Sequence, residues 1–489
     1  MLFNSFEFML LFLPVTLAVY FLLLRKRMTI AAKSWLLFAS LFFYSWWNVK
    51  YLPLILGSIL FNYTIGGLLA EYDNTAKLTV SKKTIFVNGI IANIALLCWF
   101  KYMDFFIGST NGILDSQIPL LKIVLPLGIS FFTITQIAFL VDAYEGLVEE
   151  RNLLNYALFV TFFPHLLAGP ILHHSDMMPQ FDRLRNKVVS WKNLYLGLTL
   201  FFLGLFKKVI LADTFSVWAS TGFDTTQQLT LIPAWLTSLS YTFQLYFDFS
   251  GYSDMAVGIG WMFNVRLPIN FNSPYKATGM VDFWKRWHIT LTDFITTYLY
   301  TPILRAFGKI TFTNSLVAIF LAMLISGFWH GAGWNFIIWG GMHGAGLVVN
   351  HLWKKKKLKM PAWLGWLITF NFVNISFVFF RTKSLEGAGH IFEGMAGFNG
   401  IMLHKSLEKF TLLRDTGITF GKWLDAIRGS DETWIMALIA MLIVVFFKNT
   451  MEIVSRVRPS WRWLTLLVVI SFWSLLDMSK VSEFLYFQF

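Results

Sequence analysis

The sequence predicts an all-α integral membrane protein with about 11–13 transmembrane helices, and three observations support this fold class. The 489 residues include 40 Lys and Arg and 27 Asp and Glu, so 14% are charged, against about 25% in ordinary soluble domains. Hydrophobic residues make up 56% of the chain, and the mean hydropathy is +0.60. The apolar residues gather in long runs that short basic clusters separate. A soluble globule could not cover so much apolar surface with so few charges.

The candidate spans follow one another along the whole chain. A crossing needs about 20 mostly apolar residues, and the stretches that approach this length are 6–24, 34–48, 51–70, 85–106, 118–141, 193–212, 231–247, 313–329, 335–352, 362–380, 433–447 and 463–478. The first has Glu7 at its start and basic residues after its end, which is the reverse of a secretory signal. We therefore expect it to remain as a membrane span.

The distribution of positive charge predicts orientation. The formal net charge is +13, and the basic clusters on alternate connections are 25–27, 82–83, 354–357 and 456–462. This pattern is typical of cytoplasmic loops and does not indicate a nucleic-acid groove. Residues 213–232 contain no Lys or Arg, so that connection is expected outside. The long connection at 382–432 carries several basic residues but is also assigned outside by the alternation, because long loops obey the charge rule poorly. Both termini are then extracytoplasmic.

Two apolar stretches are not expected to be simple spans. Residues 156–172 contain Pro164, Gly169 and Pro170, which interrupt helices, so a re-entrant hairpin is expected there. Residues 248–310 mix aromatic and charged side chains, which a membrane protein tolerates only around protein or a water-filled cavity. We predict one multi-span domain over 1–489, with N-terminal spans to about 150, a core at 151–380 and a C-terminal part at 381–489.

The first chemical constellation is FWKRWHITL at 283–291. At helical spacing Trp284, Trp287, His288 and Leu291 would form one face. Lys285 and Arg286 would point elsewhere, towards lipid headgroups or an anionic ligand. A histidine on an aromatic face is usually a buried core residue, so this motif alone is modest support for function.

The second constellation is SGFWHGAGWN at 326–335, where glycines and His330 interrupt an apolar run. Glycine permits a helix break or the close approach of a ligand, and an ionisable group at such a point is a functional candidate. A packing break between two spans is the alternative. His330 is the stronger of the two histidine candidates.

The third constellation is QLYFDFSGYSD at 244–254, which includes Asp248, Tyr252 and Asp254. These groups could orient a histidine, line an acceptor tunnel or bind a cation. Equally, they could be the hydrogen-bonded end of a helix with Ser250 or Ser253 as its cap. No metal site is predicted, because His173, His174 and Asp176 lack a spaced partner and Cys98 is the only cysteine.

In these motifs the chain resembles the membrane-bound O-acyltransferase family, in its bacterial alginate O-acetylation type, which is related to the D-alanyl and peptidoglycan O-acyl transfer proteins. The resemblance is strongest at 241–302 and at SGFWHGAGWNFIIWGGMHG, 326–344, and is supported by FPHLLAGPI at 163–171 and by both ends of the chain. It implies a multi-helix fold around a central tunnel in the bacterial cytoplasmic membrane.

The resemblance also implies the chemistry. His330 would be the principal catalytic residue and His288 the second. An acyl group, expected to be acetyl, would pass from a cytoplasmic thioester such as acetyl-CoA to an extracytoplasmic polysaccharide, with a secreted or membrane-anchored acetyltransferase as partner and no tightly bound cofactor. The imidazole of His330 could act as a general base or carry the acyl group itself.

The remaining site predictions are secondary. Candidates for the tunnel lining are Asp248, Tyr252, Asp254, Trp284, Trp287, Trp329, Asn335 and His343, and candidates for donor phosphates are Lys276, Lys285 and Arg286. Two other function classes stay open: a polysaccharide or lipid transporter, and a non-catalytic scaffold for a secreted transferase. No internal repeat is visible to support a transporter.

Overall fold

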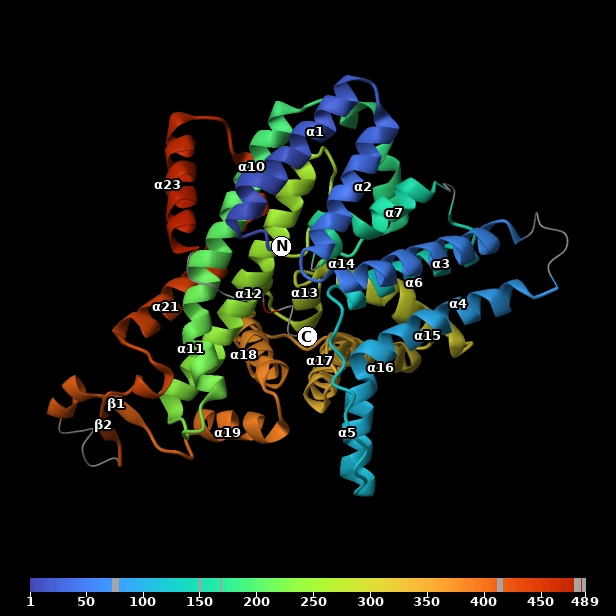
Figure 1. Ribbon diagram of the computed structural model, residues 1–489. Helices are drawn as coiled ribbons and strands as arrows, with labels where there is room; N and C mark the ends of the chain where they lie inside the picture. Colours follow the sequence, from blue (N-terminus) through green and yellow to red (C-terminus); the bar gives the residue numbers. More distant parts are fainter. Residues whose placement is uncertain (73–78, 149–151, 168, 411–416, 479–484, 486–489) are drawn as a thin grey trace. The chain divides into compact units, whose positions relative to one another are not determined.

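The computed structural model describes the chain except residues 73–78, 149–151, 168, 411–416, 479–484 and 486–489 (Figure 1). The described residues are helical almost throughout. Their strands are β1 (Met402–His404) and β2 (Thr419–Gly421), which pair in parallel with Met402 opposite Thr419. The predicted all-α class is confirmed.

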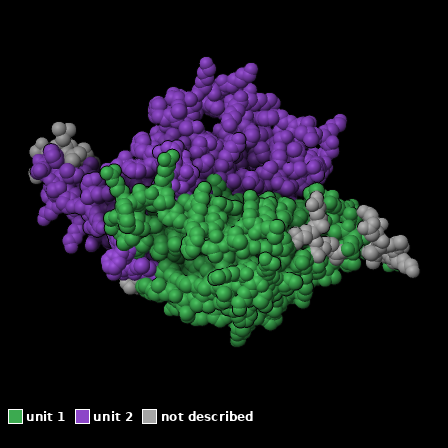
Figure 2. All heavy atoms as spheres, turned by 90° about the horizontal axis from the view of Figure 1, so that it is seen from above, with its two compact units in different colours: residues 1–205, 252–269, 458–471 green, residues 206–251, 270–457, 472–489 purple. Residues whose placement is uncertain are grey.

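The chain forms two compact units, and each is assembled from separate stretches of sequence (Figure 2). Unit 1 contains residues 1–205, 252–269 and 458–471, and unit 2 contains 206–251, 270–457 and 472–489. A single helix, α12 (Leu231–Met262), contributes residues to both. One continuous helix can therefore belong to both units.

Unit 1 holds the N-terminal helices. These are η1 (Glu7–Phe12), α1 (Leu13–Arg25), α2 (Thr29–Ser45), η2 (Val49–Tyr51), α3 (Leu52–Ala70), α4 (Lys82–Leu97), η4 (Cys98–Tyr102), α5 (Met103–Leu114), α6 (Ile129–Tyr144), α7 (Leu153–Thr161), α8 (Phe163–Leu166), α9 (His174–Met177), η5 (Met178–Phe181), η6 (Leu184–Lys187) and nearly all of α10 (Trp191–Phe206). The first turns of α23 (Trp461–Asp477) also belong to this unit.

Unit 2 holds both histidine motifs. Its elements are η7 (Lys207–Ala212), α11 (Asp213–Asp224), the first part of α12, η8 (Pro274–Lys276), α13 (Met280–Trp284), α14 (Ile289–Phe294), η9 (Ile295–Tyr300), α15 (Thr301–Ala306), α16 (Phe312–His330), α17 (Trp334–Lys355), α18 (Ala362–Arg381), α19 (Leu385–Met395), η10 (Lys405–Lys409), η11 (Asp425–Ile427), α21 (Asp431–Phe446) and α22 (Thr450–Arg456).

Six of the described helical stretches are long and apolar enough to cross a bilayer, and a seventh qualifies if the bent pair α21–α22 counts as one span. The six are Glu7–Arg25, Val49–Ala70, Lys82–Leu114, Trp191–Asp224, Phe312–His330 and Ala362–Arg381. Other predicted spans lie in shorter apolar helices, such as α2 and α6. By this criterion of length and apolar composition, at most seven of the described helical stretches qualify. This is fewer than the predicted number of about 11–13 spans.

Several predicted boundaries are wrong. Residues 118–128 are not helical: α5 ends at Leu114, Asp115 after it is left-handed, and α6 begins only at Ile129. Helix continues from α10 through η7 into α11, so part of the connection predicted at 213–232 is helical. The stretch 156–172 is broken at Phe162 between α7 and α8, with Pro164 in the first turn of α8. The break agrees with the expected interruption.

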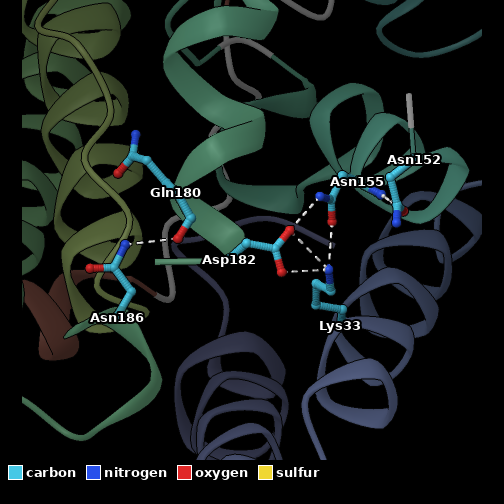
Figure 3. Close-up of polar contacts among 6 residues, drawn as sticks. All are labelled: Lys33, Asn152, Asn155, Gln180, Asp182 and Asn186. Atoms are coloured by element: carbon cyan, nitrogen blue, oxygen red, sulfur yellow. Dashed lines mark hydrogen bonds and ion pairs between the residues drawn. The ribbon is translucent and has the colours of Figure 1, made fainter. Parts of the chain in front are cut away.

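A polar cluster around the buried Lys33 ties α2 to α7 in unit 1 (Figure 3). The amine of Lys33, which is 5% exposed, donates to Asn155 Oδ1 at 2.8 Å and to Asp182 Oδ1 at 3.0 Å. The amide of Asn155 donates to the other oxygen of Asp182 at 2.7 Å. The carboxylate thus compensates the charge of an amine that lies almost out of solvent.

Helices α16 and α17 form a tightly packed hairpin in unit 2. Their backbones meet at Gly327 and Gly340, where a Cβ atom on Gly327 would lie 2.7 Å from Gly340 Cα and would also clash with the carbonyl oxygen of Phe336. Only glycine leaves room for so close a crossing. The hairpin places His330 at the end of its first arm.

Candidate functional site

His330 is the last residue of α16 and lies in an aromatic cage. The chain is extended at Gly331, and α17 begins at Trp334. The imidazole is 6% exposed, and its ring centroid lies 5.0 Å from Trp329, 5.0 Å from Trp339 and 5.4 Å from Phe380, all edge-on. The break predicted from the glycine-rich motif is confirmed, and it leaves an ionisable side chain in apolar surroundings.

His343 lies against the same indole ring. Its centroid is 4.6 Å from that of Trp339, on α17. The indole N–H of Trp284 donates to His343 Nδ1 at 3.2 Å, and His343 Nε2 lies 2.9 Å from Ser376 Oγ. Because an indole N–H can only donate, Nδ1 must accept and the proton resides on Nε2. His343 is therefore held as a neutral ring that positions its neighbours.

His288 does not share a helix face with Trp284, so that prediction is wrong. Helix α13 ends at Trp284, and α14 starts at Ile289. His288 lies between them with φ +43° and ψ 55°, in the left-handed region. The start of α14 is fixed by Asn270, whose carbonyl oxygen accepts from the Ile289 N–H at 3.0 Å. The ring of His288 is fully buried and packs edge-on against Phe249 at 4.8 Å.

Aromatic rings connect the two histidine motifs within unit 2. Trp287 packs on Phe377 at 5.4 Å, Phe377 lies 6.3 Å from Phe380, and Phe380 borders His330. Trp284 reaches the cage directly, 6.0 Å from Trp339. The structure therefore joins Trp284, Trp329, His330 and His343 in one cluster, with Trp287 at its edge.

The QLYFDFSGYSD motif is not a helix end, which corrects the capping alternative. Helix α12 runs through it without a break, so Ser250 and Ser253 lie inside the helix. Asp248 is 1% exposed and pairs with Lys208 Nζ at 2.8 Å, and Lys208 also pairs with Asp213 at 2.9 Å. The backbone N–H of Leu485 donates to Asp248 at 3.1 Å.

Tyr252 and Asp254 belong to unit 1, not to the unit that holds both histidines. Tyr252 stacks on Phe3 at 4.7 Å. Sequence reasoning missed Lys208 and Trp339. An ionisable Lys208 inside the apolar run 193–212 was an available signal, because charges at membrane depth mark functional or paired groups.

The candidate phosphate ligands differ in their surroundings. Lys276 Nζ donates to the carbonyl oxygen of Phe447 at 2.6 Å, and Arg286 pairs with Asp282 at 2.8 Å. Lys285 is exposed and lines a largely apolar cavity of about 270 Å³, which also has Trp284 in its wall. Asn335, predicted as a lining residue, donates to the carbonyl oxygen of Thr382 at 2.6 Å and so joins α17 to the end of α18.

The chain resembles known acyltransferases over its whole length. The family model described as "MBOAT, membrane-bound O-acyltransferase family" matches residues 38–386. The peptidoglycan O-acetyltransferase of Helicobacter pylori is 44% identical over 100% of this chain and 98% of that protein. The probable alginate O-acetylase AlgI of Pseudomonas aeruginosa is 39% identical over 81% of this chain and 75% of its own length.

A more distant relative is the teichoic acid D-alanyltransferase of Bacillus subtilis, which is 28% identical over 53% of this chain and 69% of that protein. The family match covers both histidine motifs and the aromatic cage around His330. This chain is an acyltransferase and belongs to the membrane-bound O-acyltransferase family.

Proposed function

We propose that this protein moves an acetyl group from acetyl-CoA on the cytoplasmic side of the bacterial inner membrane, for O-acetylation of an extracytoplasmic polysaccharide. The observation that carries the proposal is the buried imidazole of His330 at the break between α16 and α17. No tightly bound cofactor is needed, because a neutral imidazole can perform the proton transfer.

The chemistry requires a thioester carbonyl next to this imidazole. His330 takes the proton of an acceptor hydroxyl as the hydroxyl oxygen attacks the carbonyl carbon. The new C–O bond forms, the C–S bond breaks, and the thiolate leaves and is protonated to the thiol. General-base action of this kind typically contributes about 10²–10⁴-fold, so the rest of the acceleration must come from positioning.

The surrounding rings support that positioning role. Trp329, Trp339 and Phe380 surround His330, and such a wall excludes water from a reactive thioester. His288 would orient the acceptor or stabilise the developing oxyanion. Lys285, beside the 270 Å³ cavity, is the best placed of the candidate phosphate ligands, since the other two bond to protein groups.

The acceptor is inferred from the relatives. The Helicobacter pylori protein that matches nearly end to end is a peptidoglycan O-acetyltransferase, whereas the alginate O-acetylase match covers 81% of this chain. We therefore favour peptidoglycan over alginate. The final transfer would involve a secreted or membrane-anchored acetyltransferase, and both termini of this chain would be extracytoplasmic.

The test replaces His330 with Ala in cells and measures O-acetyl groups on the exported polymer. We expect the protein level to stay normal and acetylation to disappear. His390→Ala is the matched control, because that imidazole is 55% exposed and should tolerate the change. Normal acetylation in the His330→Ala strain would exclude both the base and the acyl-carrier role, and loss of polymer export would favour a transporter.

A further inference from the structure

A polar cavity of about 620 Å³ lies in unit 2, apart from the aromatic cage. It is bordered by the end of α11, the connection 225–230 and the segment from β2 to η11. Side chains in its wall include Thr221, Thr225, Gln227, Trp423, Asp425 and Arg428. None of the six is fully buried, so their polar atoms are available to a ligand.

This lining has the chemistry of a carbohydrate site. Hydroxyl and amide groups can both donate to and accept from sugar hydroxyls, and a carboxylate accepts from them. An indole presents a flat apolar face beside a polar N–H. The wall also carries Lys422 and Arg428 against one acidic residue, Asp425. The excess positive charge favours a glycan that bears carboxylates.

The walls of the cavity are held by specific bonds. The N–H of Leu231, at the start of α12, donates to the carbonyl oxygen of Gly400 at 3.1 Å, and the amide of Asn399 donates to the carbonyl oxygen of Leu229 at 3.0 Å. β1 and β2 pair next to the cavity. Arg428 is itself fixed in a left-handed conformation with φ +51°. The cavity therefore belongs to the folded unit.

A short chain of contacts leads from this cavity to His330. Thr225, in the wall, follows Asp224, whose carboxylate pairs with Arg381 at 2.8 Å. Arg381 follows Phe380, the ring that packs against His330 at 5.4 Å. The end of α11 and the end of α18 thus meet beside the end of α16. The adjoining connection lacks Lys and Arg, as expected of an extracytoplasmic loop.

We infer that this cavity binds the acceptor polymer, a carboxylate-bearing glycan strand, at the outer end of the site. The inference rests on the proposed function, since it assigns a place to the polysaccharide in that reaction. Both peptidoglycan, through its lactyl and peptide carboxylates, and uronate polymers such as alginate share the required chemistry. The experiment must distinguish these two sources.

The binding experiment uses the full chain in lipid nanodiscs and two probes. One is an oligomer of N-acetylglucosamine and N-acetylmuramic acid that retains its carboxylates, and the other is an oligomannuronate. We expect one probe to bind to the wild type. Trp423→Ala should weaken that binding by at least roughly fivefold, and Gln227→Ala should weaken it less. Trp434→Ala is the matched control, because Trp434 is 42% exposed, lies on α21 and is not among the residues in the cavity wall.

A second measurement separates this inference from the proposed function. Release of free thiol from acetyl-CoA accompanies attack by the acceptor hydroxyl, so in Trp423→Ala it should need a higher glycan concentration but reach the wild-type maximum, whereas His330→Ala should abolish it at every glycan concentration. If neither glycan binds, or if saturating glycan does not restore thiol release in Trp423→Ala, the acceptor-site inference is wrong while the acyl transfer assignment stands. Binding of a secreted transferase to this cavity in place of a glycan would also overturn it.

Discussion

The indole N–H of Trp284 donates to Nδ1 of His343 at 3.2 Å, and this bond joins α13 to α17. Both rings also contact Trp339, which forms one wall of the cage around His330. The first histidine motif therefore braces the second through the imidazole of His343.

Trp284→Phe tests this brace, because it keeps a ring but removes the N–H donor. A buried polar atom left without its partner typically costs about 1–3 kcal/mol, so we expect a lower melting temperature and a reduced acetylation rate. A double-mutant cycle with His343→Leu measures the coupling. Strictly additive losses in the two single variants would show that the bond contributes nothing.

The left-handed backbone of His288 predicts that substitutions at this position will change the stability of the protein and its activity by different amounts. A non-glycine residue in the left-handed region is disfavoured by roughly 1–2 kcal/mol, and His288 has φ +43°. His288→Gly should therefore be more stable than His288→Ala by about 1 kcal/mol. Both variants should lose activity if the imidazole is needed. Thermal unfolding and acetyl transfer are measured on each, and an active His288→Gly would remove the side chain from the mechanism.

The fold class and the position of His330 could be predicted because both depend on local sequence. Long apolar runs indicate helices in a bilayer, and glycines on either side of His330 indicate a break. His288 was misplaced because its conformation depends on Asn270, which holds the start of α14 from another segment. Helical periodicity carries no information about such long-range bonds.

The prediction for Asp248 was limited in the same way, because the residues that bond to its carboxylate are distant in sequence. Its charge is balanced by Lys208, on a different helix, and one oxygen accepts from the backbone of Leu485. Carboxylates, hydroxyls and a glycine close together suggested a helix end. Instead the helix continues, because the buried ion pair satisfies the carboxylate without any break in the backbone.

This buried ion pair makes the charge of Lys208 important for the folding of unit 2. Lys208→Met would remove the positive charge that pairs with Asp213 and Asp248, both largely buried, and breaking such a cluster typically costs about 3–5 kcal/mol. We expect little folded protein on size-exclusion chromatography. Combining Lys208→Met with Asp213→Asn and Asp248→Asn should restore folding, since the uncompensated charges are gone. A failure of this rescue would mean that packing of the lysine stem, not its charge, is what the fold requires.

The close crossing of α16 and α17 predicts the effect of Gly327→Ala, and Gly341 on α17 provides the control. Gly327→Ala places a Cβ 2.7 Å from Gly340 Cα, so the helices must separate and His330 must shift. We expect loss of acetyl transfer and a melting temperature several degrees lower. Gly341→Ala should be nearly neutral, because its Cβ would meet only the Leu324 side chain at 3.7 Å. Equal effects of the two substitutions would point to backbone flexibility as the cause.

The carboxylate of Asp182 should make the stability of unit 1 depend on pH. Burial acts to raise the pKa of Asp182, but hydrogen bonds from Asn155 and Lys33 and the charge of Lys33 outweigh it, so the pKa lies below its usual value (Figure 3). When the folded pKa is the lower one, the carboxylate stabilises the protein fully above the unfolded value. That contribution is lost as the pH falls through the folded pKa.

Asp182→Asn should therefore lower the melting temperature of the detergent-solubilised protein by a constant amount at neutral pH. The difference from the wild type should shrink once the pH falls below about 4, the usual range of an aspartate. Asp176→Asn is the control, because Asp176 is exposed on the neighbouring helix α9 and its replacement should change little at any pH. A wild-type advantage that persists unchanged into strong acid would show that the charge of Asp182 contributes nothing to joining α2 and α7, and that its advantage over asparagine comes from contacts that do not depend on charge.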